Sequence, residues 1–90
     1  MTVQKYMLTF ELLYDPNGSS LAIHGSAQGL EFFANTLLRL VKNTGEGHFN
    51  HDHLMTEEWG GSELTSKPHS TESELLNHVK VYCWKGSEFQ

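Results

Sequence analysis

The N-terminal part of the chain alternates between two sets of side chains, which is the period of a β-strand. Within residues 5–14, one set consists of Tyr6, Leu8, Phe10, Leu12 and Tyr14. Because successive strand side chains point to opposite faces of a sheet, this pattern predicts a strand with one well-buried face and one mixed face. The sequence Asp15-Pro16-Asn17-Gly18 predicts a turn, since proline presets φ and glycine accepts a positive φ. Residues 20–24 are therefore expected to return as the second strand of a hairpin.

Residues 27–42 have apolar side chains every three to four positions, which is the period of an α-helix. The stripe expected to be buried consists of Leu30, Phe33, Ala34, Leu37 and Val41. Leu38 and Leu40 widen the apolar arc, and Phe32 lies off its centre. Ser26 can cap the helix, because a serine hydroxyl accepts a hydrogen bond from the first backbone N–H groups.

The second half of the chain predicts short strands separated by polar connections. Residues 50–55 are typical of a short strand, and a turn is expected from Glu57 to Gly61. Residues 62–66 are a further candidate strand, followed by the polar connection 67–73. Residues 77–84 alternate again and predict the last strand.

These elements predict an α+β fold for a chain of 90 residues that forms a single domain, 1–90. We expect a small, mostly antiparallel sheet of four to five strands with one amphipathic helix packed on one face. The order is strand, strand, helix, strand, an optional strand, and a final strand. The other face of the sheet must then meet water or a partner, and one side of the last strand, with Tyr82 and Trp84 beside His78 and Lys80, suits that role.

The charge of the chain narrows the classes of partner. Eleven acidic residues against six basic ones give a formal net charge of −5. This balance argues against a nucleic-acid-binding protein, which needs lysine and arginine against phosphate. It is compatible with a basic protein partner or with solubility alone.

Compartment and membrane association follow from the cysteine content and the apolar runs. Cys83 is the only cysteine, so no disulfide can form within the chain. The N-terminus lacks an apolar run of the signal-peptide type, and no stretch approaches the roughly 20 apolar residues of a membrane span. We therefore expect a cytoplasmic protein without a membrane partner.

Residues 47–61 carry most of the chemistry. His51 and His53 would point to the same side of a strand, about 7 Å apart along it, and could share a divalent metal such as zinc, with His48 as a third ligand. This spacing is weak evidence, because neither a cysteine pair nor an HExxH pattern accompanies it. The alternatives are histidines that bond neighbouring groups within the fold, or histidines that recognise a partner.

The same segment offers a recognition surface but little for catalysis. Trp59, in front of two glycines, either folds back over the sheet edge or stands exposed as an interface anchor. Glu57 and Glu58 are either a solvated acidic turn or a means of selecting a basic partner. A dyad of His51 or His53 with one of these acids is conceivable, but the chain has no nucleophile elbow, phosphate loop or dinucleotide fingerprint. We do not expect an enzyme.

Three segments together resemble a known family. They are residues 51–61, HDHLMTEEWGG, residues 24–26, HGS, and residues 78–84, HVKVYCW. With them the chain resembles immunity protein family 32 of bacterial polymorphic toxin systems, roughly from the second strand to the C-terminus. The resemblance implies a small, cytoplasmic, non-enzymatic protein that binds and neutralises a cognate toxin domain by covering its active surface.

Under this hypothesis the contact residues come from the histidine segment and the last strand, and the toxin could be a nuclease with a basic cleft. The expected partner-binding residues are Glu57, Glu58, Trp59, His51, His53, Tyr82 and Trp84. No cofactor is then required. The alternative function is a small metal-binding or metal-dependent protein that uses His48, His51 and His53. A homodimer that pairs through the helix-free sheet face is a further option.

Overall fold

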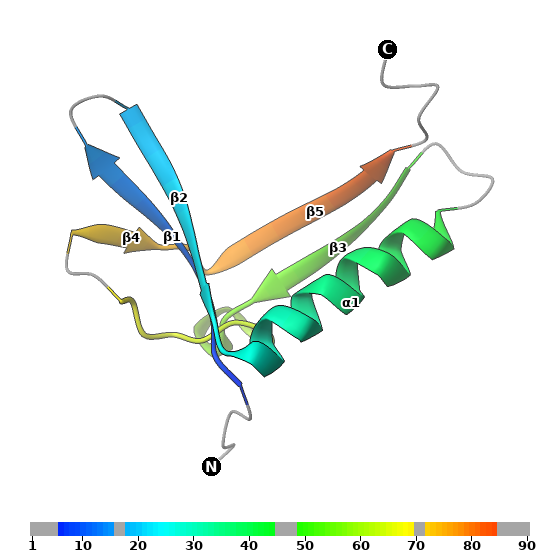
Figure 1. The fold of residues 1–90 in the computed structure, drawn as a ribbon, viewed down its shortest axis with the longest axis horizontal. Coiled ribbons are helices and arrows are strands. Elements are labelled where there is room, and N and C mark those ends of the chain that lie inside the picture. Colours follow the sequence, from blue (N-terminus) through cyan, green and yellow to red (C-terminus); the bar gives the residue numbers. More distant parts are fainter. Residues whose placement is uncertain (1–5, 16–17, 45–48, 70–71, 85–90) are drawn as a thin grey trace.

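The computed structural model describes residues 6–15, 18–44, 49–69 and 72–84, and these form one helix, five strands and a short 3₁₀ helix (Figure 1). The elements are β1 (Leu8–Asp15), β2 (Gly18–Gly25), α1 (Ala27–Asn43), β3 (Phe49–Met55), η1 (Glu57–Trp59), β4 (Ser73–Leu75) and β5 (His78–Trp84). This order confirms the predicted α+β class. No helix in these ranges is long and apolar enough to cross a membrane.

The strands are divided between two antiparallel sheets, a division that the alternation of side chains does not specify. One sheet has the order β2-β1-β4, and the other is the hairpin-like pair β3-β5. Figure 1 shows the two sheets diverging from a common base, with α1 running alongside β3. The base is therefore the place where a shared core can form.

β4 is the strand that the sequence placed wrongly. Ser73 and Leu75 pair with Leu13 and Glu11 of β1, whereas within residues 62–66 only Leu64 forms an isolated bridge, with Thr56. The three residues of β4 have no alternation long enough to recognise. They are extended because β1 offers them hydrogen bonds, so tertiary pairing decides the structure here.

The face by which α1 packs differs from the predicted stripe. The buried residues of the helix are Gly29, Thr36 and Leu40, whereas Leu30 is 45% exposed and Val41 is 61% exposed. The helix is thus turned by about 100°, or one residue, from the orientation that the large apolar side chains predict. The predicted cap is confirmed, because the Ser26 hydroxyl accepts from the Gly29 N–H at 3.1 Å.

Small side chains explain this orientation. A Cβ atom on Gly29 would lie 1.9 Å from the Met7 carbonyl oxygen, so only glycine lets the helix approach the start of β1 so closely. Thr36 is buried with its hydroxyl donating to the Phe32 carbonyl at 2.9 Å. Its polar group is satisfied inside the helix, and its burial therefore costs little.

The core at the base is small. Its fully buried members are Leu8, Phe10, Leu54 and Leu64, and they come from β1, β3 and the segment after η1. Partly buried side chains packed against it are Tyr6, Phe32, Phe33, Leu76 and Val79. Away from the base the predicted buried face of β1 opens to solvent, since Tyr14 is 61% exposed.

The second face of β1 buries a carboxylate. Glu11 has no exposed surface, and it accepts hydrogen bonds from the His69 N–H at 3.0 Å, the Ser73 hydroxyl at 2.6 Å and the Thr9 hydroxyl at 3.1 Å. These bonds attach the segment before β4 to the first sheet. His24 lies 3.9 Å from the same carboxylate and stacks on His69 with ring centroids 4.4 Å apart.

Candidate functional site

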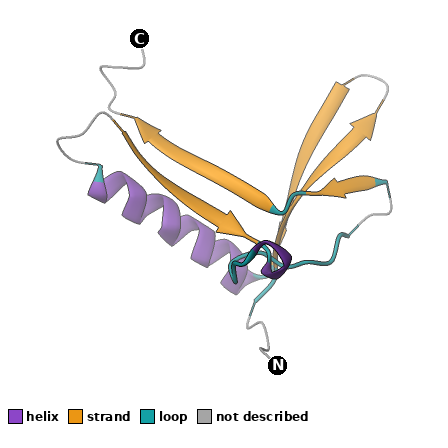
Figure 2. Cartoon of the chain, turned by 180° about the vertical axis from the view of Figure 1, so that it is seen from behind, coloured by secondary structure: helices purple, strands orange, loops and turns teal. Residues whose placement is uncertain are grey.

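The sheet formed by β3 and β5 has one face toward α1 and one face free of the helix. Residues paired directly across an antiparallel sheet share a face, and the register pairs His51 with Tyr82, His53 with Lys80, and Met55 with His78. Asp52 and Leu54 point to the helix side. Figure 2 shows β3 and β5 from the side on which α1 lies behind them.

Six rings form a continuous series along the helix-free face and over its end. We call this series the aromatic ladder; in order it consists of Trp59, His78, His53, His51, Tyr82 and Trp84. Successive ring centroids are separated by 6.0, 5.0, 4.9, 5.5 and 6.3 Å. The predicted partner-binding residues His51, His53, Trp59, Tyr82 and Trp84 therefore lie on one surface, where His78 links Trp59 to the strands. Lys80 is opposite His53 on the same face.

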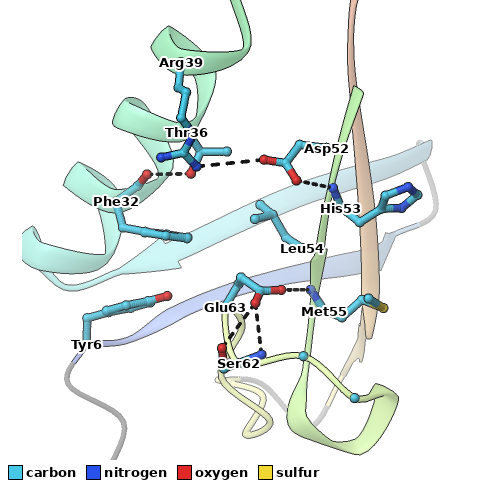
Figure 3. A pocket seen from close by; sticks show the side chains of 12 residues that line it. Tyr6, Phe32, Thr36, Arg39, Asp52, His53, Leu54, Met55, Ser62 and Glu63 are labelled. Atoms are coloured by element: carbon cyan, nitrogen blue, oxygen red, sulfur yellow. Dashed lines mark hydrogen bonds and ion pairs between the residues drawn. The ribbon is translucent and has the colours of Figure 1, made fainter. Parts of the chain in front are cut away.

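The histidines in the middle of the ladder are partly satisfied by one another. The Nδ1 atom of His53 lies 2.8 Å from the Nε2 atom of His78, so one ring donates a hydrogen bond and the other accepts it. The His53 ring points away from the helix (Figure 3). His51 packs edge-on against His53 and stacks on Tyr82.

The predicted metal site is supported only in part by the geometry. His51 and His53 do share a face, but His48 lies outside the described residues. Among residues 6–15, 18–44, 49–69 and 72–84, no group of three or more His, Cys, Asp and Glu side chains is arranged to hold a metal ion. His24 lies apart from these histidines, in the other sheet beside Glu11.

Trp59 is exposed and does not plug the sheet edge. Its side chain is 58% exposed and tilts over His78, while Tyr82 and Trp84 at the other end of the ladder are each 45% exposed. Tryptophan and tyrosine are enriched among the few residues that contribute most of the binding energy at protein interfaces. The ladder thus offers apolar contact area at both of its ends.

The turn that carries Trp59 is held rigidly by its neighbours. Gly60 adopts a φ of 92°, which favours glycine, and a Cβ atom on Gly61 would lie 2.5 Å from the Met55 carbonyl oxygen. The buried Thr56 donates its hydroxyl to Asn77 at 2.7 Å and accepts the N–H of Trp59 at 3.0 Å. The two glycines and this threonine fix where the indole stands.

Glu57 and Glu58 occupy the same turn. Both are exposed, and both precede Trp59 within η1. Two carboxylates therefore adjoin the most exposed ring of the ladder. An acidic surface beside exposed aromatic rings can complement a basic protein surface.

On the opposite side of β3, a pocket of about 500 Å³ lies between α1 and the loop after η1 (Figure 3). Tyr6 stacks on Phe32 at one side, with ring centroids 5.1 Å apart, and Arg39 approaches Asp52 to 4.0 Å at the other. Glu63 accepts the Met55 N–H at 3.0 Å. Burial and the charge of Glu63 raise the pKa of the Tyr6 hydroxyl above its ordinary value.

Sequence reasoning did not identify this pocket. Its lining residues come from the segment before β1, the helix, β3 and the loop after η1, and they share no spacing that marks a site. Its aromatic wall and charged rim could receive a side chain of a binding partner. The exposed Arg39–Asp52 pair by itself contributes little stability.

Comparison with known proteins gives one result. No curated protein and no solved structure matches the chain significantly. A family model does match it: residues 20–79 fit the model of Immunity protein 32. This match begins in β2, spans α1, β3, η1 and β4, and ends at the start of β5. It confirms the resemblance drawn from the sequence, and the chain belongs to the Immunity protein 32 family.

Proposed function

We propose that this protein neutralises a cognate bacterial toxin domain by binding it in the cytoplasm and covering its active surface. Binding alone accounts for the effect, and no reaction is catalysed. The observation that carries the proposal is the aromatic ladder, an unbroken series of rings with exposed tryptophans at both ends. Membership of an immunity family supports the general role.

The rigidity of the ladder favours tight binding. Paired strands fix the backbone of His51, His53, Tyr82 and Trp84, the glycine turn fixes the backbone of Trp59, and each ring packs on its neighbour in the ladder. Side chains that are already ordered lose little conformational entropy when a partner covers them. The rings can therefore contribute most of their buried area to affinity.

Charge complements the contact area. The chain has a net charge of −5, and Glu57 and Glu58 place two of its carboxylates beside Trp59. Acidic groups at the edge of an interface accelerate association with a basic surface and fix its orientation. A nuclease domain with a basic cleft is a toxin of the kind that this arrangement fits.

Co-expression tests this function. The chain and its cognate toxin domain should form a complex that copurifies, and the chain should restore the growth that the toxin stops. The triple variant Glu57→Lys, Glu58→Lys, Trp59→Ala should lose this protection, whereas Glu31→Lys, on the exposed side of α1, should retain it. Full protection by the triple variant would show that the toxin binds elsewhere.

A metal-binding function is a second candidate, since the predicted ligands His51 and His53 share one face of the sheet. A divalent ion such as zinc bound by His51, His53 and His48 would serve that function. Elemental analysis of protein purified without a histidine tag tests it. Less than one equivalent of metal, or an unchanged metal content in His51→Ala, would contradict it.

A further inference from the structure

The helix and the second strand expose a strip of large apolar side chains that neither the core nor the aromatic ladder uses. We call it the apolar strip; it consists of Leu21, Ile23, Leu30, Leu38 and Val41. Their exposed fractions are 55, 43, 45, 67 and 61%. Isolated apolar side chains are ordinary on a protein surface, whereas a contiguous group of them marks an interaction site.

Contacts between β2 and α1 join the two halves of the strip. Leu21 and Ile23 share a face of β2 with Gly25, and a Cβ atom on Gly25 would lie 2.8 Å from the Leu30 side chain. From Leu30 the strip continues along α1 through the exposed Ala34, one turn further on, to Leu38 and Val41. Around the helix axis Val41 lies about 20° and Leu38 about 80° from Leu30. β2 and α1 are neighbours at the base of the molecule in Figure 1.

The strip is large enough for a specific contact. With an exposed area on the order of 100 Å² for each side chain, it presents about 500 Å² of apolar surface, which is as much as the largest patch on a typical monomer. Tyr14, 61% exposed on the same face of the first sheet as Leu21 and Ile23, extends it. Two such strips against each other reach about 1,000 Å², the lower limit for a stable specific interface.

The distribution of charge favours a second copy of this chain as the molecule that covers the apolar strip. β2 contains no Asp, Glu, Lys or Arg, and α1 contains only Glu31, Arg39 and Lys42, so these two elements carry a net +1 in a chain of net −5. Two copies of an acidic chain repel each other least where their surfaces carry no net negative charge, as on α1 and β2. A basic toxin is attracted instead to the acidic surfaces of the chain. Moreover, a second copy is present whenever the protein is made, so it can cover the strip before any toxin arrives.

We propose that the apolar strip pairs with the same strip of a second copy across a two-fold axis, forming a homodimer. The contact then lies on α1 and β2, and the helix-free face of β3 and β5 stays open for the toxin. This inference does not rest on the proposed function, because the two surfaces are separate.

Sedimentation equilibrium of the full chain over about two orders of magnitude of concentration tests the dimer. The expected mass at the upper end is twice the 10.2 kDa of one chain. Leu38→Glu and Val41→Glu should each weaken dimerisation at least tenfold, since each buries a charge in an apolar contact. Asn35→Glu, which adds the same charge to an exposed position off the strip, should leave the dimer unchanged.

Thermal unfolding provides a second measurement that does not depend on the variants. The Tm of a dimer rises with protein concentration, whereas the Tm of a monomer does not. A mass of 10.2 kDa at every concentration together with a constant Tm would overturn the proposal, as would a dimer that Leu38→Glu and Val41→Glu leave intact. Both variants should still neutralise the toxin, so a failure of the dimer and a failure of the proposed function can be told apart.

Discussion

At the scale of single residues, Glu11 shows how a polar side chain can hold this small fold together. Its carboxylate is fully buried, and hydrogen bonds from the His69 N–H and the Ser73 hydroxyl fasten the chain before β4 to β1. Hydrogen bonds to a charged group contribute more than neutral ones, and a buried donor that loses its acceptor is costly. An apolar residue at this position could not accept these hydrogen bonds, so Glu11 stabilises the fold by its polarity.

We expect Glu11→Ala to lower the free energy of unfolding by about 3 kcal/mol, because the buried Thr9 hydroxyl, the His69 N–H and the Ser73 hydroxyl lose their shared acceptor. Glu11→Gln should also destabilise the protein, since its amide NH₂ group would face the donors that the carboxylate oxygens now accept. Urea unfolding measures both effects. Glu31→Gln, an exposed acid on α1, is the control and should change stability by less than about 0.5 kcal/mol. A Glu11→Gln variant as stable as the wild type would contradict this role.

A second residue-level prediction concerns alkaline pH. Burial and the charge of Glu63 raise the pKa of Tyr6 above the ordinary value of 10.0, so the folded protein keeps the tyrosine protonated where the unfolded chain ionises it. The stabilisation is present below pH 10 and is lost as the pH rises through the folded pKa. Urea unfolding between pH 8 and 11 should therefore show a steeper loss of stability in the wild type than in Tyr6→Phe. Equal slopes in the two proteins would contradict the shift.

At the scale of elements, helix α1 shows both the power and the limit of hydrophobic periodicity. The period predicted its start at Ala27 and placed its end within one residue of Asn43. It centred the buried face about one residue away from the observed one, so Phe33 packs against the core as predicted, whereas Leu30 and Val41 are exposed. Gly29 and Thr36 carry no hydrophobic signal, and they form the contact because one is small and the other satisfies its own hydroxyl. Two apolar side chains of the predicted stripe, Leu30 and Val41, belong instead to the exposed strip.

For the strands too, the alternation of side chains predicts some features and misses others. The alternation in β3 and β5 predicted that His51 and His53 share one face and that Tyr82 and Trp84 share another. It could not predict that these two faces are the same face of one sheet, since the pairing of strands depends on contacts far apart in the sequence. It likewise could not separate His24 from the other histidines or find β4. The family resemblance could be recognised from the residues alone. The aromatic ladder could not, because it depends on the register between β3 and β5.

At Gly29, helix propensity and packing predict opposite effects of an alanine substitution on stability. Replacing glycine by alanine inside a helix ordinarily stabilises it by about 1 kcal/mol. We expect Gly29→Ala to destabilise the protein instead, because the new Cβ would lie 1.9 Å from the Met7 carbonyl oxygen. Thermal unfolding compares it with Asn35→Ala, which gains propensity at an exposed position and should be slightly stabilised. A Gly29→Ala variant with a raised Tm would contradict the close packing of α1 on the start of β1.

At the scale of the whole molecule, the two sheets diverge and the structure is open. Its radius of gyration is 14.8 Å, against about 12 Å for a compact domain of this length, and its extents are 42 × 40 × 23 Å. Such a shape exposes much surface for a small core, which suits the proposed binding of a toxin domain. A partner that binds only the folded chain should stabilise it by about 4 kcal/mol when the free partner concentration is a thousand times Kd.

The open shape separates the two proposed contacts. The aromatic ladder lies on the face of β3 and β5 that is free of the helix, and the apolar strip lies on α1 and β2. A dimer through the strip would present two ladders, each available to one toxin domain. The two contacts should therefore be energetically independent, because variants at distant sites without shared partners are usually additive.

The most direct test of the toxin-binding surface is the affinity of the purified chain for its purified toxin domain, measured by titration calorimetry for the wild type, Trp59→Ala and Glu31→Lys. We predict that Trp59→Ala weakens binding at least about 30-fold, as expected for the loss of an interface anchor worth about 2 kcal/mol, and that Glu31→Lys binds within about threefold of the wild type. Circular dichroism of each variant checks that the fold is retained. If Trp59→Ala binds the toxin as tightly as the wild type, the aromatic ladder around Trp59 is not the toxin-binding surface.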